Sequence, residues 1–371
     1  VGSPENIPLQ SIPQRTEPYR SAAGLRRESL DPVVQGYKNT AAVGARLNYS
    51  DPLELNRASI TASITPTSIP SDERVHLSAL YERYDWRGRF EWNRADFYDL
   101  FGPTKTSRKG YLAAVGHQST LIFDEPRRLA LDLDGSFSGN LDRLPEYQNV
   151  VVDVRHLATG TAHLVYEDVR NSQGAVDDET GLRWSADTRV DDADGSVYRK
   201  WYATADHGWA VGAAHSSVWI RGAGGLASGS RSDPFANFYF GGFGNNWVDA
   251  GNEKRYREYA SFPGLAIDGL PGRNFVKSLV EWNLPPVRLR HAGIPGFYAT
   301  WIRPAIFVGG LATNLDAPEA RQSAADVGGQ IDFRFSLLSA LDMTVSVGGA
   351  VAYRHDSGPR REATLSVKVL R

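Results

Sequence analysis

The sequence predicts an all-β fold: a 16-stranded antiparallel transmembrane β-barrel with a long loop folded into its lumen. Three observations predict it. Apolar and polar residues alternate with a period of two from about Ala41 to the end of the chain, no stretch suits a membrane-spanning helix, and one connection is long and rich in aromatic residues. Because successive side chains of a strand point to opposite faces, each alternating run has one apolar and one polar face.

The alternation is clearest in three runs. Residues 129–137 set Leu and Phe against Asp132 and Asp134, and residues 182–190 set Trp184 against charged neighbours. Residues 327–335 repeat the pattern near the end of the chain. Charges on one face and Leu, Val, Trp and Gly on the other favour a wall between lipid and a wet lumen. The alternative is a soluble all-β domain with a Trp-rich core.

Composition narrows the function classes. The chain has 371 residues, 41% hydrophobic and 23% charged, with 36 Gly and no Cys. No run of about 18 apolar residues is present, which excludes a helical span. The lack of Cys excludes disulfides and thiolate chemistry. A net charge of -2 gives no reason to expect nucleic acid as a partner, and 11% aromatic residues suit girdles at membrane interfaces.

The chain divides at about residue 37. Residues 1–36 are rich in Pro, Ser, Gln and Arg and show no signal peptide, so we expect a flexible N-terminal lead-in of a processed or longer chain. Residues 37–371 form the expected barrel, with strands of about nine to thirteen residues that cross a bilayer at a tilt. The expected strands are residues 41–49, 58–65, 75–84, 89–97, 110–122, 128–139, 149–157, 161–169, 181–190, 197–206, 213–224, 274–283, 297–308, 325–336, 341–353 and 362–370.

One connection, residues 225–273 between the expected strands 11 and 12, is far longer than the others. Loops beyond about fifteen residues in a compact domain are usually functional or disordered. Its many aromatic residues argue against disorder, so we expect it to fold back into the lumen as a plug or gate; the alternative is an ordinary surface loop. The expected gate residues are Phe238, Tyr239, Gly241, Gly242, Trp247, Arg255 and Arg257.

Three motifs surround this connection. The first is a turn motif, Tyr166-x-Asp168-x-Arg170-Asn171 followed by Gly181. The second opens the connection as Pro234-Phe235-x-Asn237-Phe238-Tyr239-x-Gly241-Gly242, and the third ends the next strand as Glu281-x-Asn283-x-Pro285. Together they resemble the bacterial surface antigen superfamily of outer-membrane barrels, which includes BamA-like insertases and two-partner-secretion transporters. The resemblance implies sixteen strands and a sixth extracellular loop inside the lumen.

The chain departs from this family at two linked positions. The resemblance implies a V-R-G-F/Y motif at the loop tip, whose Arg pairs with the Asp of an F-x-D motif on the wall. This chain has Asn246-Trp247-Val248 at the first place and Phe307-Val308-Gly309 at the second. The joint absence of this Arg and this Asp is physically consistent, because either charge buried without the other costs roughly 3–5 kcal/mol. The family's terminal aromatic residue is also missing, since the chain ends in Leu370-Arg371.

The basic run at residues 254–259 is a candidate substitute latch. Its expected partners on the lumen wall are Glu281, Asp326 and Asp332, which occupy polar positions of alternating strands. The alternative is a solvated basic loop.

Catalysis and metal binding are not expected. No G-x-S-x-G elbow is present, and His215 beside Ser216 and Ser217 is the only local candidate for a nucleophile pair. The run Asp191-Asp192-x-Asp194-Gly195 favours a hairpin turn over a calcium loop, because the downstream Glu is missing. We therefore expect neither enzyme activity nor a cofactor.

The leading interpretation is a barrel of the Gram-negative outer membrane that translocates or inserts a polypeptide or lipid through a loop-gated lumen. Pairing of the first and last strands would then form a lateral seam. The second interpretation is a membrane anchor, or a partner barrel, for an upstream or associated soluble domain. Expected partners are outer-membrane lipid and other outer-membrane or periplasmic proteins.

Overall fold

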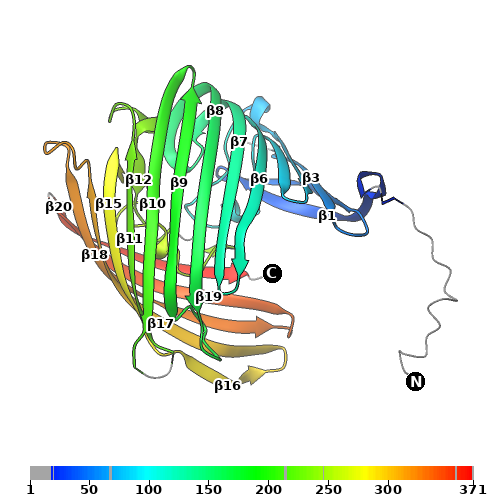
Figure 1. The fold of residues 1–371 in the computed structure, drawn as a ribbon. Helices are drawn as coiled ribbons and strands as arrows, with labels where there is room; N and C mark the ends of the chain where they lie inside the picture. The colour runs from blue at the N-terminus through cyan, green and yellow to red at the C-terminus, as the bar shows by residue number, and fades with distance from the viewer. Residues whose placement is uncertain are drawn as a thin grey trace, which may run out of the picture.

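The computed structural model describes residues 18–19, 21–66, 69–212, 215–244, 246–355 and 357–369, with the backbone alone at residues 21, 148, 290 and 291. These residues form one large sheet of 18 strands and a small two-stranded sheet (Figure 1). Among them, no helix is long and apolar enough to span a membrane. The strands are β1 Arg26–Tyr37, β2 Thr40–Ser50, β3 Asn56–Ile64, β4 Val75–Arg83, β5 Trp86–Trp92, β6 Tyr111–Asp124, β7 Arg127–Leu144, β8 Tyr147–Arg170, β9 Thr180–Ala193, β10 Ser196–Ala210, β11 Ser217–Ala227, β12 Phe238–Phe240, β13 Val248–Asp249, β14 Leu270–Gly272, β15 Asn274–Asn283, β16 Val287–Ile294, β17 Phe297–Thr313, β18 Gln322–Leu337, β19 Leu341–Arg354 and β20 Ser357–Val369.

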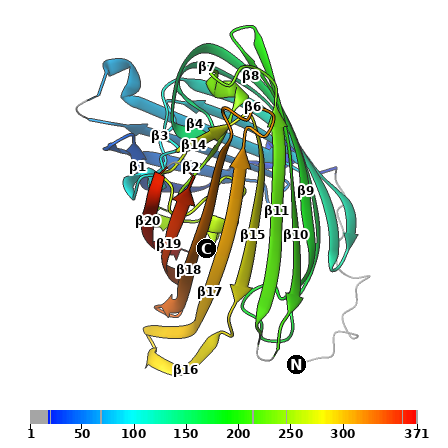
Figure 2. The same ribbon diagram turned by 90° about the vertical axis from the view of Figure 1, so that its left-hand side faces the viewer.

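The large sheet is built from sequential antiparallel pairs. Each strand from β1 to β11 pairs with the next, β11 pairs with β15, and β17 to β20 continue in order beyond β15. β16 pairs with the first half of β17. The sheet curls around the residues that link β11 to β15, and we call the space inside this curl the lumen (Figures 1 and 2).

The two edge strands, β1 and β20, do not pair with each other within the described part of the chain (Figure 2). The expected pairing of first and last strands is therefore wrong for this structure. β20 instead pairs in parallel with β13, at Val248 with Val367 and at Asp249 with Lys368. The amide of Val367 donates to the carbonyl of Trp247 at 2.7 Å. A short piece of the connection between β11 and β15 therefore lies along the open edge of β20.

Two expectations about strands were wrong. The first strand begins at Arg26, inside the segment expected to be flexible; it contains Pro32, which an edge strand tolerates. The expected hairpin near Gly160 is instead the middle of β8, because Gly160 pairs with Gly135 of β7 and Val190 of β9. Pairing on both sides overrides this local turn signal. These two differences cancel in the count. The sheet has 18 strands because β13, from the connection between β11 and β15, and β16, which pairs with β17, also belong to it.

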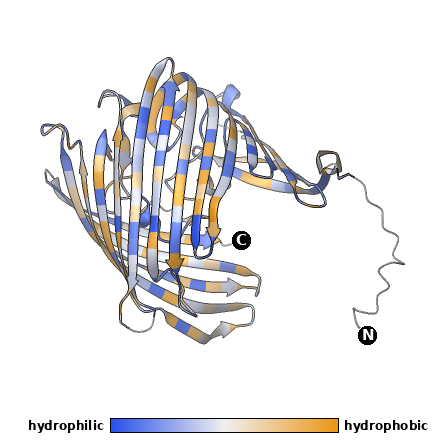
Figure 3. Cartoon of the chain, in the orientation of Figure 1, coloured by the Kyte–Doolittle hydropathy of each residue, from blue (hydrophilic) through white to orange (hydrophobic). Residues whose placement is uncertain are grey.

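Polarity is inverted across the sheet. Large apolar side chains such as those of Val280 and Val308 are exposed on the convex face, whereas charged ones such as Glu281 and Lys368 are buried on the lumen face. Alternating hydrophilic and hydrophobic bands mark the same pattern along the strands (Figure 3). The apolar core lies within the lumen, where residues of the β11–β15 connection pack on wall residues such as Phe275.

Candidate functional site

The inward face of β15 forms one wall of the site. Glu281 is fully buried, whereas the adjacent Trp282 is 43% exposed, as the pleat of a strand requires. The neighbouring strands β11 and β17 direct Arg221 and Arg303 to the same side, and both are buried. The wall therefore presents one buried carboxylate between two buried guanidinium groups.

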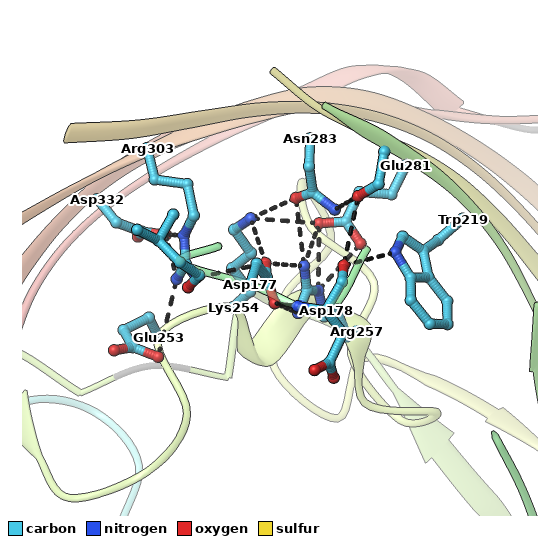
Figure 4. A network of polar contacts seen from close by, with 12 residues as sticks. Asp177, Asp178, Trp219, Glu253, Lys254, Arg257, Glu281, Asn283, Arg303 and Asp332 are labelled. Atoms are coloured by element: carbon cyan, nitrogen blue, oxygen red, sulfur yellow. Dashed lines mark hydrogen bonds and ion pairs between the residues drawn. The ribbon is translucent and has the colours of Figure 1, made fainter. Parts of the chain in front are cut away.

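Residues 228–273, called the long loop below, bring further cations to this wall. A 3-10 turn at Arg255–Arg257, labelled η7, follows Lys254, whose side chain is buried. The ring of Tyr256 stacks on Phe307 of β17, with centroids 4.3 Å apart and planes 21° from parallel. This stack holds the turn against the wall, so Lys254 and Arg257 meet Glu281 (Figure 4).

Glu281 is the centre of the contacts. Arg257 donates to it twice, from Nη2 to Oε1 at 2.8 Å and from Nε to Oε2 at 2.9 Å. Tyr256 donates its hydroxyl to Oε1 at 2.7 Å, and Arg221 donates Nε to Oε2 at 3.1 Å. Lys254 Nζ lies 3.6 Å from Oε1. A carboxylate buried this completely is stable only when such charges and donors compensate it.

The connection between β8 and β9, residues 171–179, adds a second carboxylate. Because β9, β10 and β11 run antiparallel in turn, this connection and the long loop start from opposite ends of the sheet. Asp177 Oδ2 lies 2.7 Å from Nη2 of Arg257, 3.1 Å from Nζ of Lys254 and 3.3 Å from Nη1 of Arg303. The two connections therefore meet inside the lumen (Figure 4).

The electrostatics of the meeting point follow from burial and mutual charge. Burial alone would raise the pKa of Asp177, but the positive charges of Arg257, Lys254 and Arg303 outweigh it and hold this pKa well below the usual range. Burial lowers the pKa of the Lys254 ammonium, against the opposing effect of Asp177. The carboxylate of Asp177 is thus ionised at neutral pH.

Arg303 ties the network to a third strand. Its Nη2 lies 3.1 Å from Oδ2 of Asp332 on β18, and its Nη1 donates to the carbonyl of Val176 at 2.7 Å. Asp332 also accepts from Ser346 and from Gln330, each at 2.7 Å. Every partner here is a side chain or carbonyl in a fixed strand or in a loop already tied to one. The arrangement is suited to holding a loop in place.

The expected gate residues divide into two groups. Phe238 and Tyr239 are buried, Gly241 and Gly242 have positive φ, and an added Cβ at Gly241 would lie 1.8 Å from the carbonyl oxygen of Ala266. Trp247 is 66% exposed, so it does not belong to the buried part of the long loop. Arg255 pairs with Glu258 at 2.9 Å within its own turn and not with the wall, whereas Arg257 reaches Glu281. Their role in gating stays a prediction.

The three carboxylates expected on the lumen wall also differ in what they contact. Glu281 contacts the loop cations, but Asp332 pairs with Arg303 of the wall instead. Asp326 contacts no loop cation, and its Oδ1 is buried without a hydrogen-bond partner among the described residues. A charge pattern in the sequence identifies inward-facing carboxylates without saying how far along the lumen each one lies. That is why all three carboxylates lie buried on the lumen wall, whereas only Glu281 contacts the basic run among the described residues.

The expected site omits Asp177, Arg221 and Arg303. Arg221 and Arg303 occupy polar positions of alternating strands, a signal that they share with every inward-facing residue. Asp177 lies in a polar turn that carries no distinguishing signal in the sequence.

The turn motif lies on β8 and β9, on either side of the connection that carries Asp177. Tyr166 stacks on Trp184 with centroids 5.7 Å apart, and Asp168 lies 3.7 Å from Arg170. Gly181 has φ +129°, and a Cβ there would lie 2.1 Å from the carbonyl oxygen of Asp168. This glycine is therefore required by close approach of the two strands.

The side chains considered for catalysis make hydrogen bonds to neighbouring segments of the chain. His215 Nδ1 lies 3.0 Å from Ser172 Oγ and 2.7 Å from Glu179 Oε1, so one ring nitrogen meets both groups and a proton relay through the ring is not formed. Ser216 and Ser217 donate to backbone carbonyls instead. Within the described residues, no cluster of three or more His, Asp and Glu is placed to hold a metal ion. The hairpin turn between β9 and β10 consists of Asp194 and Gly195, whereas residues 191–193 are still paired in β9.

No family model matches the chain, and no curated protein matches it. Among solved structures, the chain is similar to CdiB from Acinetobacter baumannii, with 13% sequence identity and a TM-score of 0.45. The similarity covers 93% of this chain and 59% of that one, so the chain spans less than two thirds of the length of CdiB.

Proposed function

We propose that this chain is a barrel of the bacterial outer membrane that translocates or inserts a polypeptide or lipid, with its lumen gated by the long loop. The observation that carries the proposal is the inverted polarity of the sheet, with charged side chains buried in the lumen and apolar ones exposed outside. A transmembrane barrel requires this arrangement and a soluble domain is destabilised by it.

Energetics favour lipid as the partner of the convex face. Burying apolar surface is worth about 25 cal/mol per Å², so a broad face of exposed Val, Ile, Leu and Trp is a large cost in water. Val280, Ile306 and Val327, on strands β15, β17 and β18, are each more than 40% exposed. A hydrocarbon layer around these strands removes that cost.

The charge network supports the gating part of the proposal. Arg257 and Lys254 hold the long loop to Glu281, and Asp177 holds it to the opposite end of the lumen. Removing one member of such a buried cluster leaves an uncompensated charge. This cluster takes the place of the Arg–Asp latch that the family resemblance implies and the chain lacks.

The same network also favours a second candidate, a membrane anchor or partner barrel with a lumen that stays closed. Several buried charges cross-link the long loop to β15 directly, and to β11 and β17 through Glu281 and Asp177. A loop held by so many contacts opens only when a further interaction compensates for their loss. Under this candidate the network is purely structural.

Single-channel recording distinguishes the two candidates. The chain is purified in detergent, inserted into a planar bilayer and compared with a variant lacking residues 230–269. A gated barrel is expected to conduct weakly or intermittently and to conduct steadily after the deletion. Conductance unchanged by the deletion overturns loop gating. Purification as a monodisperse, stable protein without any detergent overturns the membrane assignment itself.

A further inference from the structure

The long loop fills the lumen unevenly. Its aromatic residues pack toward β7 and β8, with Phe235 in the cluster of Leu141 and Val154, and toward β17 and β19, with Phe243 in the cluster of Phe307. Against β1 to β5, a hollow of about 960 Å³ is left open. Its lining on these five strands combines polar residues (Asp31, Arg46, Asn48, Thr61, Ser78 and Glu91) with the apolar Pro32, Val33 and Val34 of β1.

A second hollow, of about 470 Å³, adjoins the first. The two share Asp96, Tyr98 and Ala250 among their lining residues. The second lies between the long loop and the connection from β5 to β6, residues 93–110. The two hollows therefore adjoin each other, one against the inner wall of β1–β5 and the other beside this connection, which we call the lid segment.

The lid segment bridges the hollow from one side to the other. On the β1 side, Gly36 and Asp96 exchange two backbone hydrogen bonds of 2.7 and 3.0 Å, and Gln35 Nε2 donates to the carbonyl of Ala95 at 3.0 Å. On the loop side, the amide of Thr104 donates to Asn246 Oδ1 and Asn246 Nδ2 donates to the carbonyl of Thr104, both at 2.7 Å.

The fastenings of the lid segment and of the long loop differ in strength. The contacts that bridge the hollow are neutral hydrogen bonds, each worth about 0.5–1.5 kcal/mol. The ends of the lid segment also form ion pairs, Lys109 with Asp72 at 2.6 Å and Arg94 with Glu91 at 3.4 Å, but solvent reaches both pairs and weakens them. The long loop is held by buried charges centred on Glu281, and removing a partner from such a cluster costs roughly 3–5 kcal/mol. Of the two obstacles in the lumen, the lid segment is the easier to displace.

We propose that an extended polypeptide segment occupies the hollow along β1–β5, and that the lid segment, rather than the long loop, opens to let it pass. This inference rests on the barrel and translocation parts of the proposed function, and it assigns the opening step to the lid segment in place of the long loop. Acidic Asp31 and Glu91 and basic Arg46 line the hollow together with hydroxyl and amide groups. This lining offers charges of both signs, hydrogen-bonding groups and apolar side chains such as Val33 and Phe97. Such a mixture matches a polypeptide of varied sequence better than a ligand of one charge or an acyl chain, which would meet the charged groups.

Two disulfide locks test the route, and the absence of native Cys makes each introduced pair unique. The pair V248C/V367C joins the long loop to β20 at positions paired in neighbouring strands, within disulfide reach. The pair T104C/N246C joins the lid segment to the long loop where the two side chains touch. Each purified full chain is recorded in a planar bilayer when oxidised and again after dithiothreitol.

The expected result is conductance like that of the unsubstituted chain for oxidised V248C/V367C, and loss of openings for oxidised T104C/N246C. Dithiothreitol is expected to restore the openings of the second variant, which controls for folding in the same sample. The reverse pattern, with openings lost on locking the long loop, overturns this inference and leaves loop gating standing. A chain that never conducts, locked or reduced, overturns the proposed function and this inference with it.

Labelling of the wall supplies a second test. Ser78 lines the hollow, whereas Ser346 is fully buried against Asp332 on the other side of the lumen. A cationic methanethiosulfonate reagent is expected to reduce the conductance of Ser78→Cys and to leave Ser346→Cys unchanged. An unstructured synthetic peptide is expected to interrupt the current of the unsubstituted chain, and labelled Ser78→Cys is expected to lose these interruptions. Interruptions that persist after labelling overturn the proposed route.

Discussion

Arg257 and Glu281 form a two-point ion pair inside the lumen, with Nη2 2.8 Å from Oε1 and Nε 2.9 Å from Oε2. The pair joins the middle of the long loop to the inward face of β15. Arg257 also reaches Asp177, which arrives from the opposite end of the sheet. One guanidinium group therefore links three segments that are distant in the sequence.

Replacing Glu281 by Gln is expected to lower the free energy of unfolding by roughly 3 kcal/mol, because Arg257, Arg221 and Lys254 lose the carboxylate that compensates them. The measurement is the temperature at which the folded form disappears in heat-modifiable gel migration. Glu82→Gln on the exposed part of β4 is the matched control and should migrate like the unsubstituted chain. Equal transition temperatures for the two variants would contradict a central role for Glu281.

Asp177→Asn is expected to weaken the attachment of the long loop in a pH-dependent way. The pKa of Asp177 is lower in the folded chain than in the unfolded one, so its contribution is fully present above the unfolded value of about 4 and is lost as the pH falls below it. The stability difference between the original chain and Asp177→Asn should be constant from about pH 5 to 8 and shrink in stronger acid. Limited proteolysis of the long loop at each pH measures it. A difference that grows on acidification would show the opposite sign and refute the assignment.

Gly181→Ala is expected to destabilise the β8–β9 pair by about 1–3 kcal/mol, since the new methyl group meets the carbonyl oxygen of Asp168 and the backbone has φ +129°. Gly160→Ala is the control within β8, because nothing lies within 4 Å of the position of its Cβ. Denaturant unfolding in detergent compares the two. If both alanine variants unfold alike, the turn glycine is not required.

A lysine on the convex face tests where the hydrocarbon lies. Val308 of β17 and Val287 of β16 are 52% and 53% exposed, so they differ in position along the wall and not in exposure. Val308→Lys is expected to cost about 2–4 kcal/mol in phospholipid vesicles and Val287→Lys about 0–1 kcal/mol, since the cost is largest near the bilayer centre. Urea unfolding in vesicles measures both. Equal small costs would indicate that water, not lipid, covers this face.

The alternation of polar and apolar residues made the strands and their facing predictable, because the period of two is a local property of the pleat. The strands that escaped this reasoning are those in which pairing outweighs local signals. β1 carries Pro32 and many charges, and β8 runs through the turn-like Thr159-Gly160 because it has a partner on each side.

The sequence suggested that charged residues attach the long loop to the wall, but it did not identify all the residues that do so. A basic segment in a long loop and carboxylates at inward positions suggested an ionic attachment, and Glu281 does lie against Arg257. Asp326 and Asp332 were indistinguishable from Glu281 in the sequence, yet they lie at other places in the lumen. Asp177 comes from a connection at the opposite end, and such a long-range meeting is set by the curl of the whole sheet rather than by any local pattern.

The short parallel pair between β13 and β20 has a consequence for how copies of this chain meet one another at high concentration. An unpaired strand edge displays a row of amide and carbonyl groups on which a second molecule can add a strand, the first step of aggregation. Here Trp247 and Val248 cover part of that row on β20, and Asp96 covers part of the corresponding row on β1 at Gly36. Both open edges of the sheet are thus partly covered by connecting segments of the same chain, which leaves less free backbone for self-association.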